Sequence, residues 1–186
     1  MKNAIIIHGT YGNPDENWFP WLKTELEKIG YKVYVPTFPT PENQNLKSWI
    51  GVIENYHIEF NKETIIIGHS VGASFILSIL ESLDSPIRAA FLVSGFLGLL
   101  GNEEFDNLNY TFTTKPLNWK KIQNNVGKIF IYHSNNDPYV PIEQARMLAK
   151  HLNVNPVIIE NGGHFNKEAG YKEFPKLLLN IKNLDN

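Results

Sequence analysis

A serine between two glycines is the side chain in this sequence best suited to chemistry. Gly68, Ser70 and Gly72 lie in the segment Gly-His-Ser-Val-Gly, which matches the pattern G-x-S-x-G. In this pattern the serine occupies a sharp turn between a strand and a helix, and the flanking glycines allow two backbones to approach closely. The turn exposes the hydroxyl as a nucleophile. The alternative is that Ser70 only caps the helix that follows.

A nucleophilic serine needs a base, and the base needs a carboxylate that orients it. On this kind of turn the expected chain order is serine, acid, histidine. Asp137 is the candidate acid because it follows closely after an apolar segment, whereas Asp84 and Asp106 lie far from the end of any such segment. The alternative role for Asp137 is to cap a turn before Pro138.

His164 is the candidate base, since it alone follows an apolar segment through a flexible Asn-Gly-Gly turn. His133 falls in or at the end of a predicted strand. His151 falls near the end of a predicted helix, where a cation complements the helix dipole. Taken alone, His164 would be an ordinary loop histidine; with Ser70 and Asp137 present, we expect a catalytic triad.

Two backbone N–H groups are expected to stabilise the oxyanion of such a reaction. One belongs to the residue after the nucleophile, Val71, and the other to the loop after the first strand, where Thr10 is the best candidate. For the substrate pocket, we expect aromatic residues from this first loop and from the segment after the fourth strand. The pocket candidates are Tyr11, Trp18, Phe96 and Trp119, although the tryptophans around position 18 are equally suited to the core.

These residues must be positioned by a sheet, and the hydrophobic pattern predicts one. Short apolar segments predict strands over residues 4–7, 31–35, 64–68, 89–93, 128–133 and 156–159. Helical spacing of apolar residues separates them. Parallel neighbours need such crossover helices, so we predict a doubly wound α/β fold with a mostly parallel six-stranded sheet. Ligands bind at the carboxyl ends of the strands in such folds.

Two segments are harder to interpret. A helical stripe is predicted after the second strand, and residues 96–118 carry loop signals that fit either a small lid or a long loop. The predicted stripe consists of Leu46, Ile50, Ile53, Tyr56 and Phe60.

Composition excludes several other classes of function. The chain has 186 residues, 42% of them hydrophobic, which is typical of one folded domain spanning residues 1–186. Seventeen Lys and Arg against nineteen Asp and Glu give a net charge of −2, so we expect no nucleic-acid partner. The absence of cysteine removes disulfides and thiolate metal sites.

Cofactors and membranes are also not expected. No G-x-G-x-x-G segment follows the first strand, and no paired histidine spacing supports a metal site, which would draw on His8, His69, His133 and His164. The longest apolar segment, residues 89–100, is interrupted and shorter than the roughly 20 residues of a membrane span. Four apolar residues before His8 are too few for a signal peptide. We therefore expect a cytoplasmic protein.

Nearly the whole chain resembles a small α/β-hydrolase family, that of the retinoblastoma-binding protein nine type. The segments that carry the resemblance are residues 17–22, 64–72, 115–119, 137–141 and 162–166. The resemblance implies a minimal hydrolase fold without a large cap, and it places the family triad on Ser70, Asp137 and His164.

The sequence departs from this family at two places. Residues 58–62 read Ile-Glu-Phe-Asn-Lys where the animal protein has an L-x-C-x-E segment, so no retinoblastoma-type partner is expected. Asn136 stands where the family often has a second aspartate.

We therefore expect a serine hydrolase, without cofactor, that cleaves small esters or amides. The alternatives are a non-catalytic binding module on the same fold, or an acyltransferase, thioesterase or peptidase with the same triad.

Overall fold

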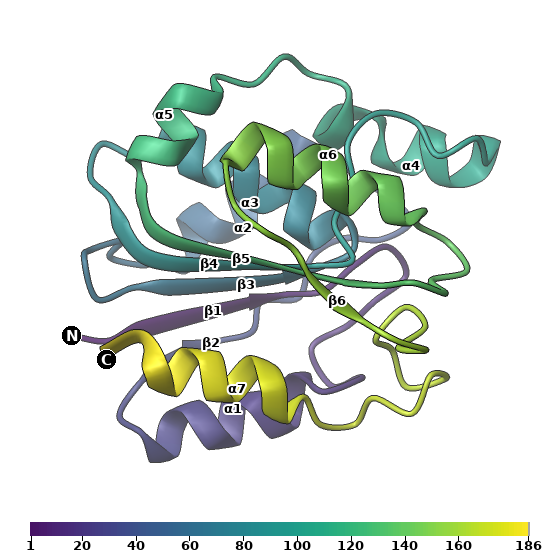
Figure 1. Ribbon diagram of the computed structural model, residues 1–186. Coiled ribbons are helices and arrows are strands. Elements are labelled where there is room, and N and C mark those ends of the chain that lie inside the picture. The colour runs from purple at the N-terminus through teal and green to yellow at the C-terminus, as the bar shows by residue number, and fades with distance from the viewer. Residues whose placement is uncertain (186) are drawn as a thin grey trace.

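Six parallel strands form one sheet in the computed structural model, which describes residues 1–185 (Figure 1). The strand order is β2-β1-β3-β4-β5-β6, and each neighbouring pair is parallel. Each predicted strand overlaps an observed one, and the predicted doubly wound α/β fold is confirmed. The strands are β1 (Asn3–Ile7), β2 (Lys32–Tyr34), β3 (Ile65–His69), β4 (Ile87–Val93), β5 (Val126–Ser134) and β6 (Val157–Ile159).

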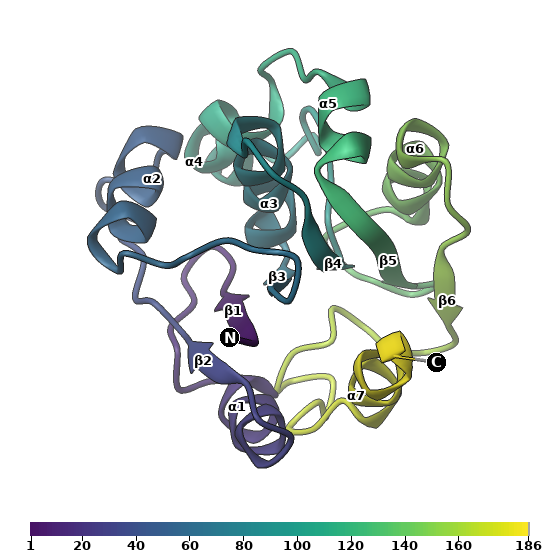
Figure 2. The same ribbon diagram turned by 90° about the vertical axis from the view of Figure 1, so that its left-hand side faces the viewer.

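Helices cover both faces of this sheet. Figures 1 and 2 show α1 and α7 on one face and the other five helices on the opposite face. The helices are α1 (Phe19–Lys28), α2 (Leu46–Asn55), α3 (Val71–Ser82), α4 (Glu103–Thr113), α5 (Trp119–Asn124), α6 (Ile142–Leu152) and α7 (Pro175–Lys182), followed by the short 3₁₀ helix η1 (Asn183–Asp185). Within residues 1–185, none of the helices has the length and apolar character that crossing a membrane requires.

The central strands are apolar on both sides because each side packs against helices. In β1, Ile5 and Ile7 join the hydrophobic cluster beneath α2 and α3, whereas Ala4 and Ile6 join the cluster on the α1 and α7 face. This alternation is the two-residue period of a strand. Burial on both faces explains why the parallel strands read as continuous apolar segments in the sequence.

The predicted stripe in the second helix is partly wrong. Helix α2 ends before Tyr56 and Phe60, and Ile50 is 38% exposed. The helix instead buries Trp49, which stacks on Phe38 with ring centroids 4.5 Å apart. Phe38 comes from the proline-rich connection before the helix, so a contact distant in sequence selects the buried face.

The segment after β4 contains two helices, whereas the sequence pattern fitted either a small lid or a long loop. Helix α4 begins after Asn102, whose side chain accepts a hydrogen bond from the Phe105 N–H at 3.1 Å. Together with α5, it forms a short insertion before β5, and the fold has no large cap. Helix α4 contacts the loop after β1, because Thr10 Oγ1 donates to Asn109 at 2.8 Å.

The chain leaves β1 and β3 toward opposite faces of the sheet. The connection after β1 leads to α1, and the connection after β3 leads to α3 on the other face (Figure 2). Loops therefore diverge at the carboxyl ends of these neighbouring strands, which is where ligands bind in open α/β sheets.

Candidate active site

Ser70 lies on the sharp turn between β3 and α3, as its sequence motif predicts. Its backbone has φ 56° and ψ −125°, a conformation that side-chain-bearing residues rarely adopt. The Ser70 N–H donates to the Val93 carbonyl at 2.8 Å, which attaches the turn to the end of β4. The turn is tight at Gly68, where an added Cβ would lie 2.5 Å from the Gly72 carbonyl oxygen.

Gly68→Ala should therefore destabilise the protein by about 3 kcal/mol, the upper end of ordinary overpacking. The atoms that the new methyl would meet belong to the backbone of Gly72 and Ala73 and cannot rotate away. Gly51→Ala is the matched control, because Gly51 lies inside α2 with no neighbouring atom within 4 Å of an added Cβ. It should stabilise the protein by about 0.5–1 kcal/mol. Urea unfolding of both variants measures the difference, and equal effects would contradict the tight turn.

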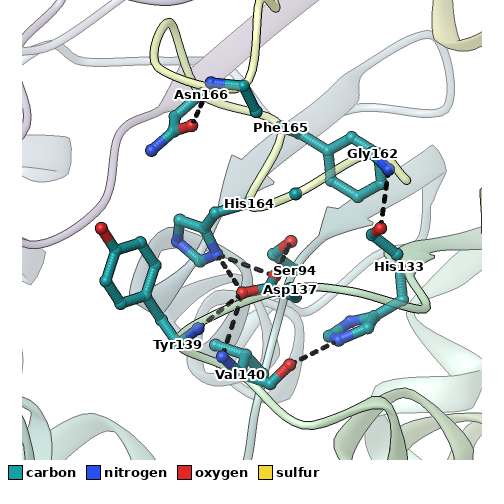
Figure 3. A network of polar contacts seen from close by, with 12 residues as sticks. Ser94, His133, Asp137, Tyr139, Val140, Gly162, His164, Phe165 and Asn166 are labelled. Carbon is teal, nitrogen blue, oxygen red and sulfur yellow. Dashed lines mark hydrogen bonds and ion pairs between the residues drawn. The ribbon is translucent and has the colours of Figure 1, made fainter.

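Asp137 and His164 form a hydrogen-bonded pair (Figure 3). The Nδ1 atom of His164 lies 2.8 Å from Oδ2 and 3.0 Å from Oδ1 of Asp137, and the side chain of Asp137 is fully buried. Oδ1 also accepts the N–H groups of Tyr139 and Val140, each at 3.0 Å. Because the carboxylate can only accept, Nδ1 carries the proton, and the other ring nitrogen is left as an acceptor.

Ser94 is a further partner of Asp137 that sequence reasoning missed. Its Oγ donates to Asp137 Oδ2 at 2.8 Å, and the residue is fully buried at the end of β4 with φ 48°. Burial alone would raise the pKa of Asp137. The hydrogen bond and charge of His164, together with the two backbone N–H groups, outweigh burial and lower this pKa below its usual range.

The end of β5 holds the turn that leads to His164. Asn135 Oδ1 accepts the Asn161 N–H, and Ser134 Oγ accepts the Gly162 N–H, both at 2.8 Å. Asn136 Oδ1 accepts the Gly163 N–H at 2.8 Å. Asn136 therefore acts as a support for the glycine turn.

Two further side chains hold the backbone around His164 through hydrogen bonds. His69, inside the G-x-S-x-G segment, donates through Nε2 to the His164 carbonyl at 2.7 Å. Trp18 donates through Nε1 to the Phe165 carbonyl at 2.9 Å. Burial, and then the nearby imidazole of His164, lower the pKa of His69 to about 3. His69 is therefore neutral at physiological pH.

The neutral state of His69 predicts acid sensitivity of the fold. Between about pH 6.5, the ordinary histidine pKa, and about pH 3, the unfolded chain binds a proton at this residue and the folded chain does not. The contribution of His69 to the free energy of unfolding is therefore fully present above pH 6.5. As the pH decreases below this value, the free energy of unfolding decreases by about 1.4 kcal/mol per pH unit because of this group. Burial lowers the pKa of His8 and His133 in the same direction.

His69→Gln should reduce the slope of stability against pH by the contribution of this one group, because glutamine keeps a donor and does not titrate. The measurement is the free energy of unfolding in urea at several pH values from 7 to 4.5. His57→Gln, at an exposed position, is the control and should keep the wild-type slope. A wild-type slope in His69→Gln would show that this histidine is protonated in the fold.

Ser70 and His164 line one cavity of about 1030 Å³ at the carboxyl end of the sheet. Within residues 1–185, the Ser70 hydroxyl has no hydrogen-bond partner, so it is free for a ligand or for His164. Gly9 lies beside it, since an added Cβ there would be 2.9 Å from Ser70 Cβ. The loop after β1 therefore borders the nucleophile, as the sequence predicts.

Thr10 and Val71 are the two positions predicted to supply oxyanion donors. Val71 begins α3 directly after Ser70, and Thr10 lines the cavity one residue after Gly9. Neither backbone N–H donates to an acceptor within residues 1–185. Both are thus available for a negatively charged oxygen near Ser70.

His8 supports this loop from below the cavity. It is fully buried; its Nδ1 donates to the Gly9 carbonyl at 2.8 Å, and its Nε2 accepts the Phe38 N–H at 3.0 Å. These two bonds require the neutral ring, in agreement with the pKa that burial lowers.

The four predicted pocket residues divide into two pairs. Tyr11 and Phe96 line the cavity, together with Leu100, Phe105 and Tyr139. Trp18 and Trp119 do not, so their assignment to the pocket is wrong. Trp18 is fully buried in the core below the His164 loop, where its indole meets the need for a hydrogen bond. Trp119 lies on α5 and stacks on His151 at 4.3 Å.

No three His, Asp or Glu side chains within the described part of the chain are grouped as ligands of a metal ion would be. Charged side chains do line the cavity, but both signs occur together. They are Asp15, Glu16, Lys167, Glu168 and Lys172.

Comparisons with known proteins identify relatives of this chain. The sequence model of the family described as serine hydrolase matches residues 4–183. The chain is 28% identical to the putative hydrolase YdeN of Bacillus subtilis, over 94% of this chain and 91% of that protein. It is also 28% identical to the serine hydrolase RBBP9 of Rattus norvegicus, over 97% and 94% of the two chains.

Solved structures share the fold. The crystal structure of the ydeN gene product of B. subtilis superposes with a TM-score of 0.91 and 26% identity, covering 99% of this chain and 98% of that one. Est1E of Butyrivibrio proteoclasticus, solved with ferulic acid bound, superposes with a TM-score of 0.70 and 18% identity, covering 97% and 90%. At 18% identity, the similarity to Est1E shows a shared fold and nothing about activity.

Proposed function

Because this chain belongs to the serine hydrolase family, we propose that it hydrolyses small carboxylic esters or amides through an acyl-enzyme on Ser70. The protein is a hydrolase of the RBBP9 and YdeN type. The proposal adds the catalytic residues, the substrate class and the route of the reaction.

The observation that carries the proposal is the pairing of buried Asp137 with His164, which lines the same cavity as Ser70. The buried carboxylate holds the proton on Nδ1, so Nε2 is the basic nitrogen. His164 is then the base that removes the hydroxyl proton from Ser70. Asp137 orients the ring and stabilises the imidazolium that forms.

The reaction has two steps. In the first, Ser70 Oγ attacks the carbonyl carbon, its proton passes to His164 Nε2, and the oxyanion is held by the Thr10 and Val71 N–H groups. The tetrahedral intermediate collapses, and His164 returns the proton to the departing alcohol or amine. In the second step, water attacks the acyl carbon and gives its proton to His164 Nε2. The bond to Ser70 Oγ then breaks, His164 returns the proton to Ser70 Oγ, and the carboxylic acid leaves.

The cavity supports small substrates with an apolar acyl group. Phe96, Leu100 and Phe105 contribute apolar surface, and no large cap covers the opening. Tyr139 also lines the cavity, and its ring contacts the His164 imidazole edge-on at 5.1 Å. This apolar surface supports an apolar acyl group as the part of the substrate that the cavity holds.

A panel of p-nitrophenyl esters and amino-acid anilides tests the proposal. We expect turnover of acetyl and butyryl esters that follows saturation kinetics and exceeds that of Ser70→Ala under the same conditions. The absence of turnover above this control for every compound would contradict the proposal and favour the binding-module alternative.

A further inference from the structure

A buried amide of α4 faces the cavity without using its nitrogen. Asn109 is 2% exposed and lines the same cavity as Ser70. Its Oδ1 accepts two hydrogen bonds at 2.8 Å, from Thr10 Oγ1 and from Gln44 Nε2. Within residues 1–185, its Nδ2 has no acceptor. The amide is thus fixed on one side and unsatisfied on the other.

The orientation of this amide follows from its neighbours. Gln44 lies 3.3 Å from the Leu108 carbonyl, which can only accept, so the nitrogen of Gln44 faces that side. The Gln44 oxygen accepts the Thr40 hydroxyl at 2.5 Å on the other side. Two nitrogens facing each other form no hydrogen bond, so Asn109 directs Oδ1 toward Gln44 and Nδ2 away from it.

The nitrogen of Asn109 reaches open space rather than packed protein. Asn109 Nδ2 is not among the side-chain polar atoms of the described residues that are fully enclosed without a partner. The open space that Asn109 lines is the cavity. Its neighbour there is Thr10, whose backbone N–H is a proposed oxyanion donor.

We propose that Asn109 binds substrate, with Nδ2 donating a hydrogen bond to an oxygen of the acyl group beside the scissile carbonyl. This inference rests on the proposed function. A nearly buried donor without an acceptor is costly, so an acyl oxygen at this place is favoured over a methylene. Asn109 thereby selects ether-, hydroxyl- or carbonyl-containing acyl groups over pure hydrocarbon chains.

Two esters of equal size test this selection. p-Nitrophenyl methoxyacetate differs from p-nitrophenyl butyrate by one oxygen in place of a methylene. The ratio of kcat/KM for the methoxyacetate to kcat/KM for the butyrate is divided by the same ratio of their hydroxide hydrolysis rates. This division corrects for the difference in intrinsic reactivity, and the result is the corrected preference. We expect this corrected preference to be about tenfold for the wild type, as for one well-formed hydrogen bond.

Variants at position 109 locate the preference. Asn109→Asp keeps the oxygen that Thr10 and Gln44 use and replaces the donor, whereas Asn109→Leu removes the amide without adding charge. Both should abolish the preference for the methoxyacetate, lowering the corrected ratio to about one or below, and circular dichroism shows whether each variant is folded. The same substitutions at Asn107, an exposed position of α4, should leave the preference unchanged.

Several outcomes overturn the inference. The inference is overturned if the wild type shows no corrected preference, and this result does not depend on whether the variants fold. It is also overturned if folded Asn109 variants keep the preference. An equal loss for both esters would place Nδ2 on the oxyanion instead of the acyl group. If neither ester is turned over above Ser70→Ala, the proposed function fails and the inference falls with it; turnover of both without preference rejects the inference alone.

Discussion

Ser70→Ala is expected to lower kcat/KM for p-nitrophenyl esters by about 10⁴ to 10⁶ fold. The variant removes the oxygen that forms the covalent intermediate, and the oxyanion donors and cavity that remain supply only residual catalysis. The turn itself should survive, because its backbone hydrogen bond to Val93 does not involve the side chain. Initial rates with acetyl and butyryl esters measure the loss.

Ser78→Ala is the matched control for this experiment. Ser78 lies two turns along the same helix, 5% exposed, and its hydroxyl is enclosed without a partner. Removing an unsatisfied hydroxyl should leave activity within about twofold and should not lower stability. Loss of activity in both variants would show that packing of α3, and not the nucleophile, explains the effect.

Asp137→Asn is expected to lower kcat by about 10⁴ fold. The amide can present its NH₂ group to His164 Nδ1, which then favours the proton on the wrong ring nitrogen. The Ser94 hydroxyl and the N–H groups of Tyr139 and Val140 also lose the charge that they stabilise. Burial of His164 is unaffected, so substrate binding should change much less than kcat.

The control for this substitution is Asp84→Asn, at an exposed position far from the cavity. It should keep wild-type kcat. Circular dichroism separates a catalytic defect in Asp137→Asn from a loss of fold. A folded Asp137→Asn variant with kcat within tenfold of wild type would exclude this carboxylate as the orienting group.

The fold was predictable because each central strand is a short apolar segment that can be recognised in the sequence alone. Residues such as Ile5, Ile6 and Ile66 are buried from both faces, so the strands appear as short apolar segments between helical patterns. The turn at Ser70 was predictable for a related reason. The turn needs glycine because backbone atoms only a few residues apart in the sequence approach closely. A requirement between residues so near in the sequence appears as a short motif.

Contacts between segments far apart in the chain could not be predicted from the sequence. The helix after Asn102 could have been inferred from its acidic first turn, Glu103, Glu104 and Asp106, but the surrounding glycines masked this signal. Trp18 illustrates the opposite error. A tryptophan near a site fits a pocket as well as a core, and only the position of the Phe165 carbonyl decides between them.

Supporting residues of the site were the hardest to foresee. Ser94 and Asn136 are small polar residues at strand ends, where the sequence pattern does not distinguish a cap from a partner of the acid. Their roles depend on the lateral pairing of β4 with β5 and on the return of the chain after β6. Strand order is needed before such neighbours can be identified.

Labelling with a fluorophosphonate, followed by mass spectrometry of the peptides, tests most directly whether Ser70 is an activated nucleophile. We expect one label per chain on the peptide that contains Ser70, full labelling of Ser78→Ala, and none of Ser70→Ala. A label that persists in Ser70→Ala, or that maps to another serine in the wild type, would contradict the account.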